Sequence, residues 1–195
     1  MKLRLSIALI FLAALTRLLP NESLVYLGDT GLLPHPDNFT PIGAMALFGA
    51  AYFSRQALTL AVPFIARFVS ALLLNNIIYR QYYTGFTLIT SWWIYAAFGL
   101  MMLVGWLLLR QKVTLSRVAI AGLIASAVFF LVTNFSVWLE GTMYPKTTAG
   151  LMACYAAGLP FLKNTVMGDL FFSAVLFGTY EWAMRGKWLM KVDKG

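Results

Sequence analysis

The chain has 195 residues, of which 61% are hydrophobic and only 11% are charged. A soluble domain usually carries about 25% charged residues, and a disordered segment has few large apolar side chains, so neither class fits. A helix that spans a bilayer needs about 20 apolar residues, which leaves room for several spans and no separate soluble domain. We therefore expect a single transmembrane domain over residues 1–195.

The formal net charge is +8, a value that can indicate a nucleic-acid-binding protein. Here the basic residues lie between apolar runs rather than on one polar surface, and in that position they act as topology signals. We expect no nucleic-acid partner. Cys154 is the single cysteine, so the sequence gives no disulfide framework.

Apolar runs predict six helices in chain order, at residues 3–19, 39–54, 57–78, 86–109, 115–139 and 165–184. The first run could instead be a signal peptide, but it extends past Arg17 without a clean cleavage site, which favours a retained helix. The second run is short and could form a hairpin with the third that does not fully cross. A cytoplasmic turn at Arg55 favours two crossings.

The basic residues set the orientation, because cytoplasmic loops are enriched in Lys and Arg. A cytoplasmic N-terminus places most of them inside: Lys2, Arg4, Arg55, Arg110, Lys112, Arg117, Arg185, Lys187, Lys191 and Lys194. Arg80, Lys146 and Lys163 then lie outside. The pattern predicts a six-helix bundle with both termini cytoplasmic.

Three outer loops follow from this topology, at residues 20–38, 79–85 and 140–164. The part of the third loop at 149–162 is too short to cross, and Pro160 should break a helix there, so we expect an interfacial or re-entrant piece. Because the inner connections are short, any binding site is expected on the outer side.

Polar side chains at membrane depth are costly and need a partner or a function. Arg67 and Asn75 share one face of the third predicted helix, and Asp169 lies about one turn into the sixth. Together these groups predict a polar cavity that opens outward. The expected solute contacts are Asn38, Arg67, Asn75, Asn134, Trp138, Tyr144, Asn164 and Asp169.

Structural explanations compete with this hypothesis. Asp169 and Arg17 could neutralise each other, the asparagines could join helices by hydrogen bonds, and the tryptophans could form an interfacial belt. Arg67 has two explanations: it bonds to carbonyls freed by Pro63, or it meets an anionic group of a ligand. Glu181 could pair with Arg185 four residues later.

Sequence signatures of catalysis are absent: there is no HExxH, GxSxG or Walker loop, and His35 is the single histidine. We therefore expect no enzyme activity, no cofactor and no metal site. Without a Walker loop, energised transport would need a partner or an ion gradient.

Three stretches carry a family resemblance: PHPDNFTPIGAMALFGAAYF at 34–53, SALLLNNIIY at 70–79, and residues 133–181 with YPKT, CY and GD. They resemble an uncharacterised bacterial family, a domain of unknown function, that is described as membrane transport proteins. That family is similar to the substrate-binding S components of energy-coupling factor vitamin transporters. The resemblance implies a six-helix bundle that holds a small molecule between the outer helix ends, and a separate ATPase and coupling-protein module.

The leading hypothesis is a multi-pass protein of the bacterial inner membrane that takes up a small, vitamin-like solute from the outer side. The alternative is a membrane scaffold or assembly subunit that does not transport. The alternative predicts that every polar group is paired internally and that no cavity exists.

Overall fold

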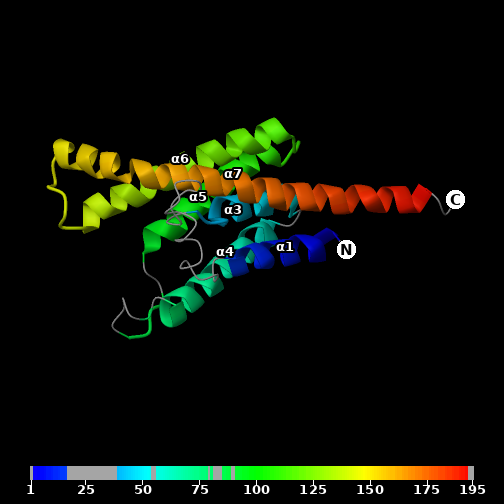
Figure 1. Ribbon diagram of the computed structural model, residues 1–195, viewed down its shortest axis with the longest axis horizontal. Coiled ribbons are helices and arrows are strands. Elements are labelled where there is room, and N and C mark those ends of the chain that lie inside the picture. The colour runs from blue at the N-terminus through cyan, green and yellow to red at the C-terminus, as the bar shows by residue number, and fades with distance from the viewer. Residues whose placement is uncertain are drawn as a thin grey trace, which may run out of the picture.

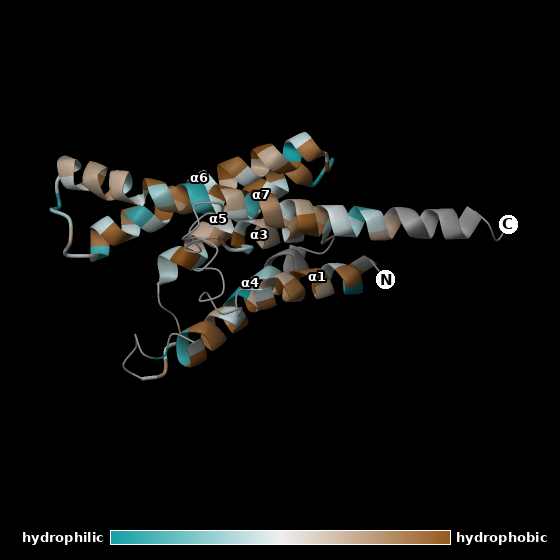
Figure 2. Cartoon of the chain, in the orientation of Figure 1, coloured by the Kyte–Doolittle hydropathy of each residue, from teal (hydrophilic) through white to brown (hydrophobic). Residues whose placement is uncertain are grey.

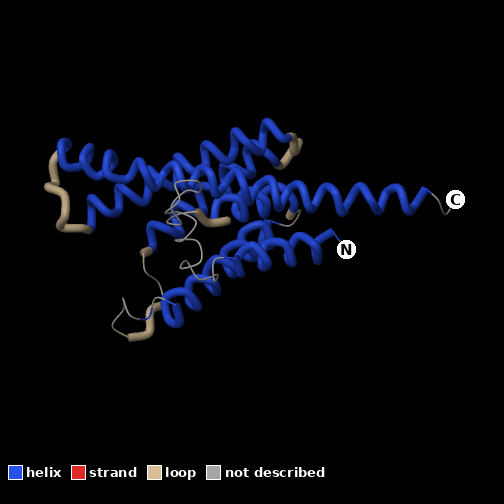
Figure 3. The backbone as a smooth tube through the Cα atoms, viewed as in Figure 1, coloured by secondary structure: helices blue, strands red, loops and turns tan. Residues whose placement is uncertain are grey.

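The computed structural model describes residues 2–16, 39–53, 56–78, 80, 85–88 and 91–192, and helices make up nearly all of this part (Figure 3). The helices are α1 (Lys2–Thr16), α3 (Ile42–Tyr52), α4 (Gln56–Leu73), α5 (Trp92–Leu109), α6 (Leu115–Glu140) and α7 (Thr148–Val192). A π-helical segment, η1 (Leu74–Ile78), continues α4. Over the described residues there is no strand, so the predicted all-helical class is confirmed. The predicted loop 20–38, with His35 and Asn38, and the neighbouring Arg17 lie outside the described residues.

The helices run back and forth along one long axis (Figure 1). The N-terminus of α1 and the C-terminus of α7 lie at the same end of the molecule, and the α5–α6 turn points toward that end. The α6–α7 turn lies at the opposite end, where these two helices project as a hairpin. Exposed Arg110 and Lys112 follow α5, so basic residues lie toward the end that holds the termini.

The predicted break at Pro160 is wrong. α7 is a single helix of 45 residues that contains Pro160 and begins well before the predicted start at residue 165. Proline removes one backbone hydrogen bond and crowds the preceding turn, but a long helix tolerates this loss where its neighbours hold it. At about 1.5 Å per residue α7 is about 68 Å long, more than twice the hydrocarbon thickness of a bilayer.

Two helices of the described part, α5 and α6, are long and apolar enough to cross a membrane. Of the 18 residues of α5, 33% are buried inside the molecule, and of the most apolar 18-residue stretch of α6, 28% are buried. The apolar surfaces of these two helices are therefore largely uncovered. Figure 2 colours much of α6 near the α5–α6 turn brown and the turn itself teal. Uncovered apolar surface of this extent favours contact with a membrane.

The core of the molecule forms around α3, which is short and buried on every side. It has 11 residues, and those from Ile42 to Ala50 are all buried. It contacts each of the other α-helices in the described part. At about 1.5 Å per residue α3 is about 16 Å long, roughly half of a membrane span. Pro41 and Ile42 are buried, so the N-terminal end of α3 lies inside the bundle.

The N-terminus of α3 is the end that needs partners, since the first backbone N–H groups of a helix have no acceptor within it. Pro41 stands at the N-cap position, has no N–H of its own and offers no side-chain cap. The carboxylate of Asp169, from α7, accepts hydrogen bonds from the backbone N–H groups of Gly43 and Ala44. Ser126 of α6 donates a third hydrogen bond to Asp169, with an Oγ–Oδ2 distance of 2.7 Å. The fully buried Asp169 thus joins α3, α6 and α7 at one point.

Glycines allow the close approaches around α3. A Cβ at Gly43 would lie 2.3 Å from both carboxylate oxygens of Asp169, so this position has no space for a side chain. A Cβ at Gly168 would lie 3.0 Å from the backbone nitrogen of Thr40, which shows how tightly α7 packs on the segment before α3. On the other side, a Cβ at Gly105 would lie 2.9 Å from that of Ala50, so α5 also packs closely on α3.

Replacing Asp169 tests this arrangement. We expect Asp169→Asn to destabilise the protein by about 3 kcal/mol, because an amide group has one acceptor oxygen in place of the two that Ser126, Gly43 and Ala44 share. The measurement is thermal unfolding of the purified protein in detergent. Glu140→Gln is the matched control, since Glu140 is exposed and should change stability by less than about 1 kcal/mol. Equal melting temperatures for the two variants would contradict a structural role for Asp169.

Candidate functional site

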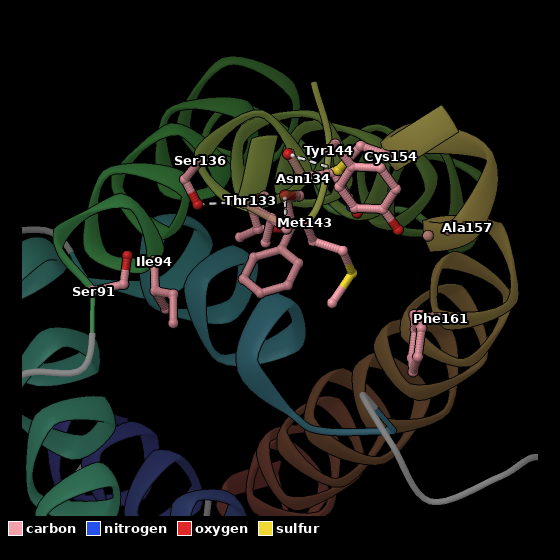
Figure 4. Close-up of a pocket in the computed structure, with 13 residues that line it drawn as sticks. Ser91, Ile94, Thr133, Asn134, Ser136, Met143, Tyr144, Cys154, Ala157 and Phe161 are labelled. Carbon is pink, nitrogen blue, oxygen red and sulfur yellow. Dashed lines mark hydrogen bonds between the residues drawn. The ribbon is translucent and has the colours of Figure 1, made fainter. Parts of the chain in front are cut away.

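A pocket of about 460 Å³ lies near the α6–α7 turn, where these helices diverge beside the start of α5. We call it the hairpin pocket. Figure 4 shows Ser91 and Ile94 of α5 on one side, Phe161 of α7 on the other, and residues of α6 between them. Its lining residues are Ser91, Ile94, Phe129, Thr133, Asn134, Ser136, Val137, Met143, Tyr144, Cys154, Ala157, Gly158 and Phe161. An apolar lining with a few polar groups is typical of a small-molecule site.

The polar groups of α6 in this pocket direct their donors at the helix itself. Thr133 donates to the carbonyl of Phe129 at 2.8 Å, and Asn134 donates to that of Phe130 at 2.9 Å. Ser136 donates to the carbonyl of Thr133 at 2.7 Å. The oxygens of these side chains can still accept hydrogen bonds, and the amide oxygen of Asn134 lies against Gly158 of α7. Ser91 adds a buried hydroxyl that makes no hydrogen bond within the described residues.

One wall of the pocket is a tight contact between α6 and α7. The thiol of Cys154 donates to the carbonyl of Asn134, with an S–O distance of 3.3 Å, and is buried. One turn later, a Cβ at Gly158 would lie 2.4 Å from the amide oxygen of Asn134 and 2.9 Å from the ring of Phe130. Gly158 therefore allows Asn134 to keep its position beside the pocket.

Trp138 belongs to the turn rather than to the pocket lining. Its indole N–H donates to the carbonyl of Pro145 at 2.9 Å. Lys146 donates to the carbonyls of Trp138 and Gly141 and lies over the Trp138 ring. These contacts close the turn from residue 141 to residue 147. Trp93 donates to Glu140 at 2.7 Å and packs on Phe135, so aromatic side chains gather at this end.

The predicted solute contacts fall in several places. Asn134 and Tyr144 lie together in the hairpin pocket. Asn164 is buried deeper on α7, and Asp169 is held by α3 and Ser126 and so has a structural role. The predicted pairing of Asp169 with Arg17 lies outside the described residues, as does Asn38. Glu181 accepts a hydrogen bond from Tyr52 at 2.6 Å, while the side chain of Arg185 is outside the described part.

Asn75 and Asn76 lie in η1, the π-helical end of α4. Asn75 is buried. Asn76 donates to the carbonyls of Leu72 and Thr87, both at 2.9 Å, and its amide oxygen accepts from the backbone N–H of Thr87 at 2.8 Å. Asn76 thus holds the extended segment before α5 against the end of α4. Single-turn π segments often occur at functional sites, and here the segment also serves the connection.

Arg67 is buried on α4, with 5% of its surface exposed, and its guanidinium lies over the ring of Tyr95 on α5. The distance from Cζ to the ring centroid is 5.6 Å. Its Nε and Nη1 atoms are buried and make no hydrogen bond within the described part of the chain. Carbonyls freed by Pro63 therefore do not account for these two atoms.

Several lining residues of the pocket are absent from the predicted site. Cys154, Gly158 and Phe161 were expected in a loop, but they follow one face of α7 at intervals of four and three residues. This spacing indicates one face of a helix, and the three residues were not grouped because a break was expected at Pro160. Ser91, Thr133 and Ser136 carry no comparable signal, because short hydroxyl side chains are common in membrane helices.

A second cleft of about 630 Å³ lies between α6 and α7 nearer the termini. It contains Ser173, which is buried with an unbonded hydroxyl in the described part, and Glu181. The remaining lining is apolar apart from Thr114. Among the described residues, no group of three or more His, Cys, Asp or Glu side chains could hold a metal ion.

Comparison with protein families identifies the chain. Residues 1–190 match the model of a family of unknown function, DUF6580. The chain belongs to this family. Comparison with curated proteins finds no match, and comparison with solved structures finds none either. The predicted membership of an uncharacterised family is confirmed, while the resemblance to S components stays a prediction from the sequence.

Gly158 and Gly178 on α7 provide a matched test of the pocket wall. Gly158→Ala should destabilise the protein by about 2 kcal/mol, because the new methyl group overlaps Asn134 and Phe130. Gly178→Ala should be neutral or stabilising, since nothing lies within 4 Å of its added Cβ and alanine favours helix. Thermal unfolding of both variants in detergent measures the difference. A Gly158→Ala variant as stable as Gly178→Ala would show that α6 and α7 do not pack this closely.

Proposed function

We propose that this protein spans the bacterial inner membrane several times and holds a small organic solute in the hairpin pocket for uptake from the outer side. The observation that carries the proposal is the pocket itself, which combines an apolar lining with the hydroxyl and amide groups of Ser91, Thr133, Asn134 and Ser136. Such a site suits a solute with an apolar body and hydroxyl or amine donors.

Membrane insertion is supported by the uncovered apolar faces of α5 and α6. Large exposed side chains such as Leu107, Leu115 and Trp182, at 63%, 84% and 79% of their surface, would otherwise face water. The common position of the two termini fits an even number of crossings with both termini cytoplasmic (Figure 1). In this orientation the basic residues after α5 lie inside and the hairpin pocket faces outward.

The resemblance to S components gives the finer form of the proposal. A protein of that kind captures a vitamin-like solute and relies on a separate ATPase and coupling protein for energy. The acceptor oxygens of Thr133, Asn134 and Ser136 are the groups that would orient the solute, and Tyr144 and Phe161 would contact its body.

Solute retention tests the proposal. The wild-type protein, Gly158→Ala and Gly178→Ala are purified in mild detergent from the same cells, and released small molecules are identified by mass spectrometry. We expect wild type and Gly178→Ala to carry the same solute at near-equal occupancy, and Gly158→Ala to lose at least about nine-tenths of it, equivalent to about 1.4 kcal/mol of binding energy.

Two results would contradict the proposal. Wild-type protein that carries no small molecule above an unrelated membrane protein would favour a scaffold or assembly subunit. Equal retention by Gly158→Ala and Gly178→Ala would show that the solute binds elsewhere.

A further inference from the structure

We propose that Arg67 binds an oxyanion group of the solute, so that the substrate class is a small organic acid with a carboxylate or phosphate group. This inference rests on the proposed function. It begins with the burial of Arg67 on α4, where 5% of its surface is exposed and the guanidinium face lies on Tyr95.

A cation–π contact uses the face of the guanidinium group and leaves its N–H edges free. The Nε and Nη1 edges of Arg67 are buried and make no hydrogen bond within the part of the chain that the structure describes. Burying a charged donor without an acceptor is among the largest penalties that a fold can contain. An acceptor with negative charge would remove this penalty.

The carboxylates among the described side chains have other partners. They are Glu140, Asp169 and Glu181. Glu140 accepts from Trp93, Asp169 from Ser126 and α3, and Glu181 from Tyr52. None of these contacts involves Arg67. An external oxyanion therefore fits the guanidinium better than these carboxylates do.

Arg67 packs on α5, the helix whose first turn contributes to the hairpin pocket, although neither Arg67 nor Tyr95 lines that pocket. Ser91 and Ile94 of α5 line the pocket, and Tyr95, which contacts Arg67, comes directly after Ile94. Phe64 and Phe68 lie beside Tyr95, with centroid distances of 6.3 and 6.5 Å. An oxyanion at Arg67 would thus have the rings of Tyr95, Phe64 and Phe68 near it, which suits an aromatic or other ring-bearing acid.

The test compares wild type, Arg67→Gln and the control Arg110→Gln, since Arg110 is exposed and lies over Trp106. Melting temperatures are measured in uncharged detergent with sodium benzoate, sodium phosphate or neutral benzamide, at equal ionic strength. We expect benzoate or phosphate to raise the melting temperature of wild type and Arg110→Gln by about 3 °C, as a ligand at about ten times its Kd would. Benzamide should not raise the melting temperature of any of the three proteins. None of the three compounds should raise the melting temperature of Arg67→Gln. No rise in wild type with either anion, or an equal rise in Arg67→Gln, would overturn the proposal.

Two further arms identify the source of the negative charge. Without ligand, Arg67→Gln should melt at or above the wild-type temperature, because it removes a buried cation whose Nε and Nη1 make no hydrogen bond within the described residues. The proposal would be overturned if Arg67→Gln melts below wild type and a triple variant, Glu22→Gln with Asp29→Asn and Asp37→Asn, melts equally low. That result would assign Arg67 to an ion pair within the chain. The second arm uses nanodiscs that contain phosphatidylglycerol. If this lipid stabilises wild type but not Arg67→Gln, and benzoate and free phosphate have no effect, Arg67 binds a lipid headgroup and the proposal is overturned.

The outcome is separable from that of the proposed function. If Gly158→Ala loses the retained solute while benzoate or phosphate still raises the melting temperature of Arg67→Gln, the hairpin pocket is supported as the solute site and the proposed role of Arg67 is wrong. If Gly158→Ala keeps its solute while Arg67→Gln loses the anion effect, the anion site stands and the hairpin pocket is not the solute site.

Discussion

The buried N-terminus of α3 is the constraint on which the rest of the structure depends. Pro41 and Ile42, at the start of this 11-residue helix, are buried, so its first N–H groups lie inside the bundle away from water. Asp169 supplies acceptors to Gly43 and Ala44, and Ser126 completes its hydrogen bonds. A single carboxylate therefore satisfies two N–H groups at this helix end and joins α3, α6 and α7.

This contact also explains how the two most distinctive sequence blocks work together. The block around Thr40 and Gly43 and the Gly168–Asp169 pair are far apart in the chain, yet Gly168 packs on Thr40 and Asp169 on Gly43. From that point α7 runs past α6 toward the α6–α7 turn, and the two helices diverge around Asn134 and Gly158 to form the hairpin pocket. The position of the pocket is thus set by the point at which the helices are joined.

Much of the helical content could be predicted from the length and apolarity of the runs, because these depend on local composition. For example, α6 begins at the predicted residue and ends one residue beyond the predicted end. The continuity of α7 through Pro160 could not be predicted in this way, since the rule that proline ends a helix ignores neighbouring helices. Asp169 stands out in the sequence as an unusual residue, but its partners on α3 are backbone N–H groups, which leave no sequence signal. Asn134 and Tyr144 were predicted and share one pocket, while Arg67 was predicted without its contact with Tyr95.

The most direct measurement of the central contact is amide hydrogen exchange at Gly43 and Ala44, in wild type and in Ser126→Ala, which removes one hydrogen bond to Asp169 without touching α3. The account predicts slow exchange of both amides in wild type and exchange about ten times faster or more in the variant, as a loss of about 1.4 kcal/mol of protection would give. Fast exchange of these two amides in wild type would show that Asp169 does not hold the end of α3, and would contradict the account.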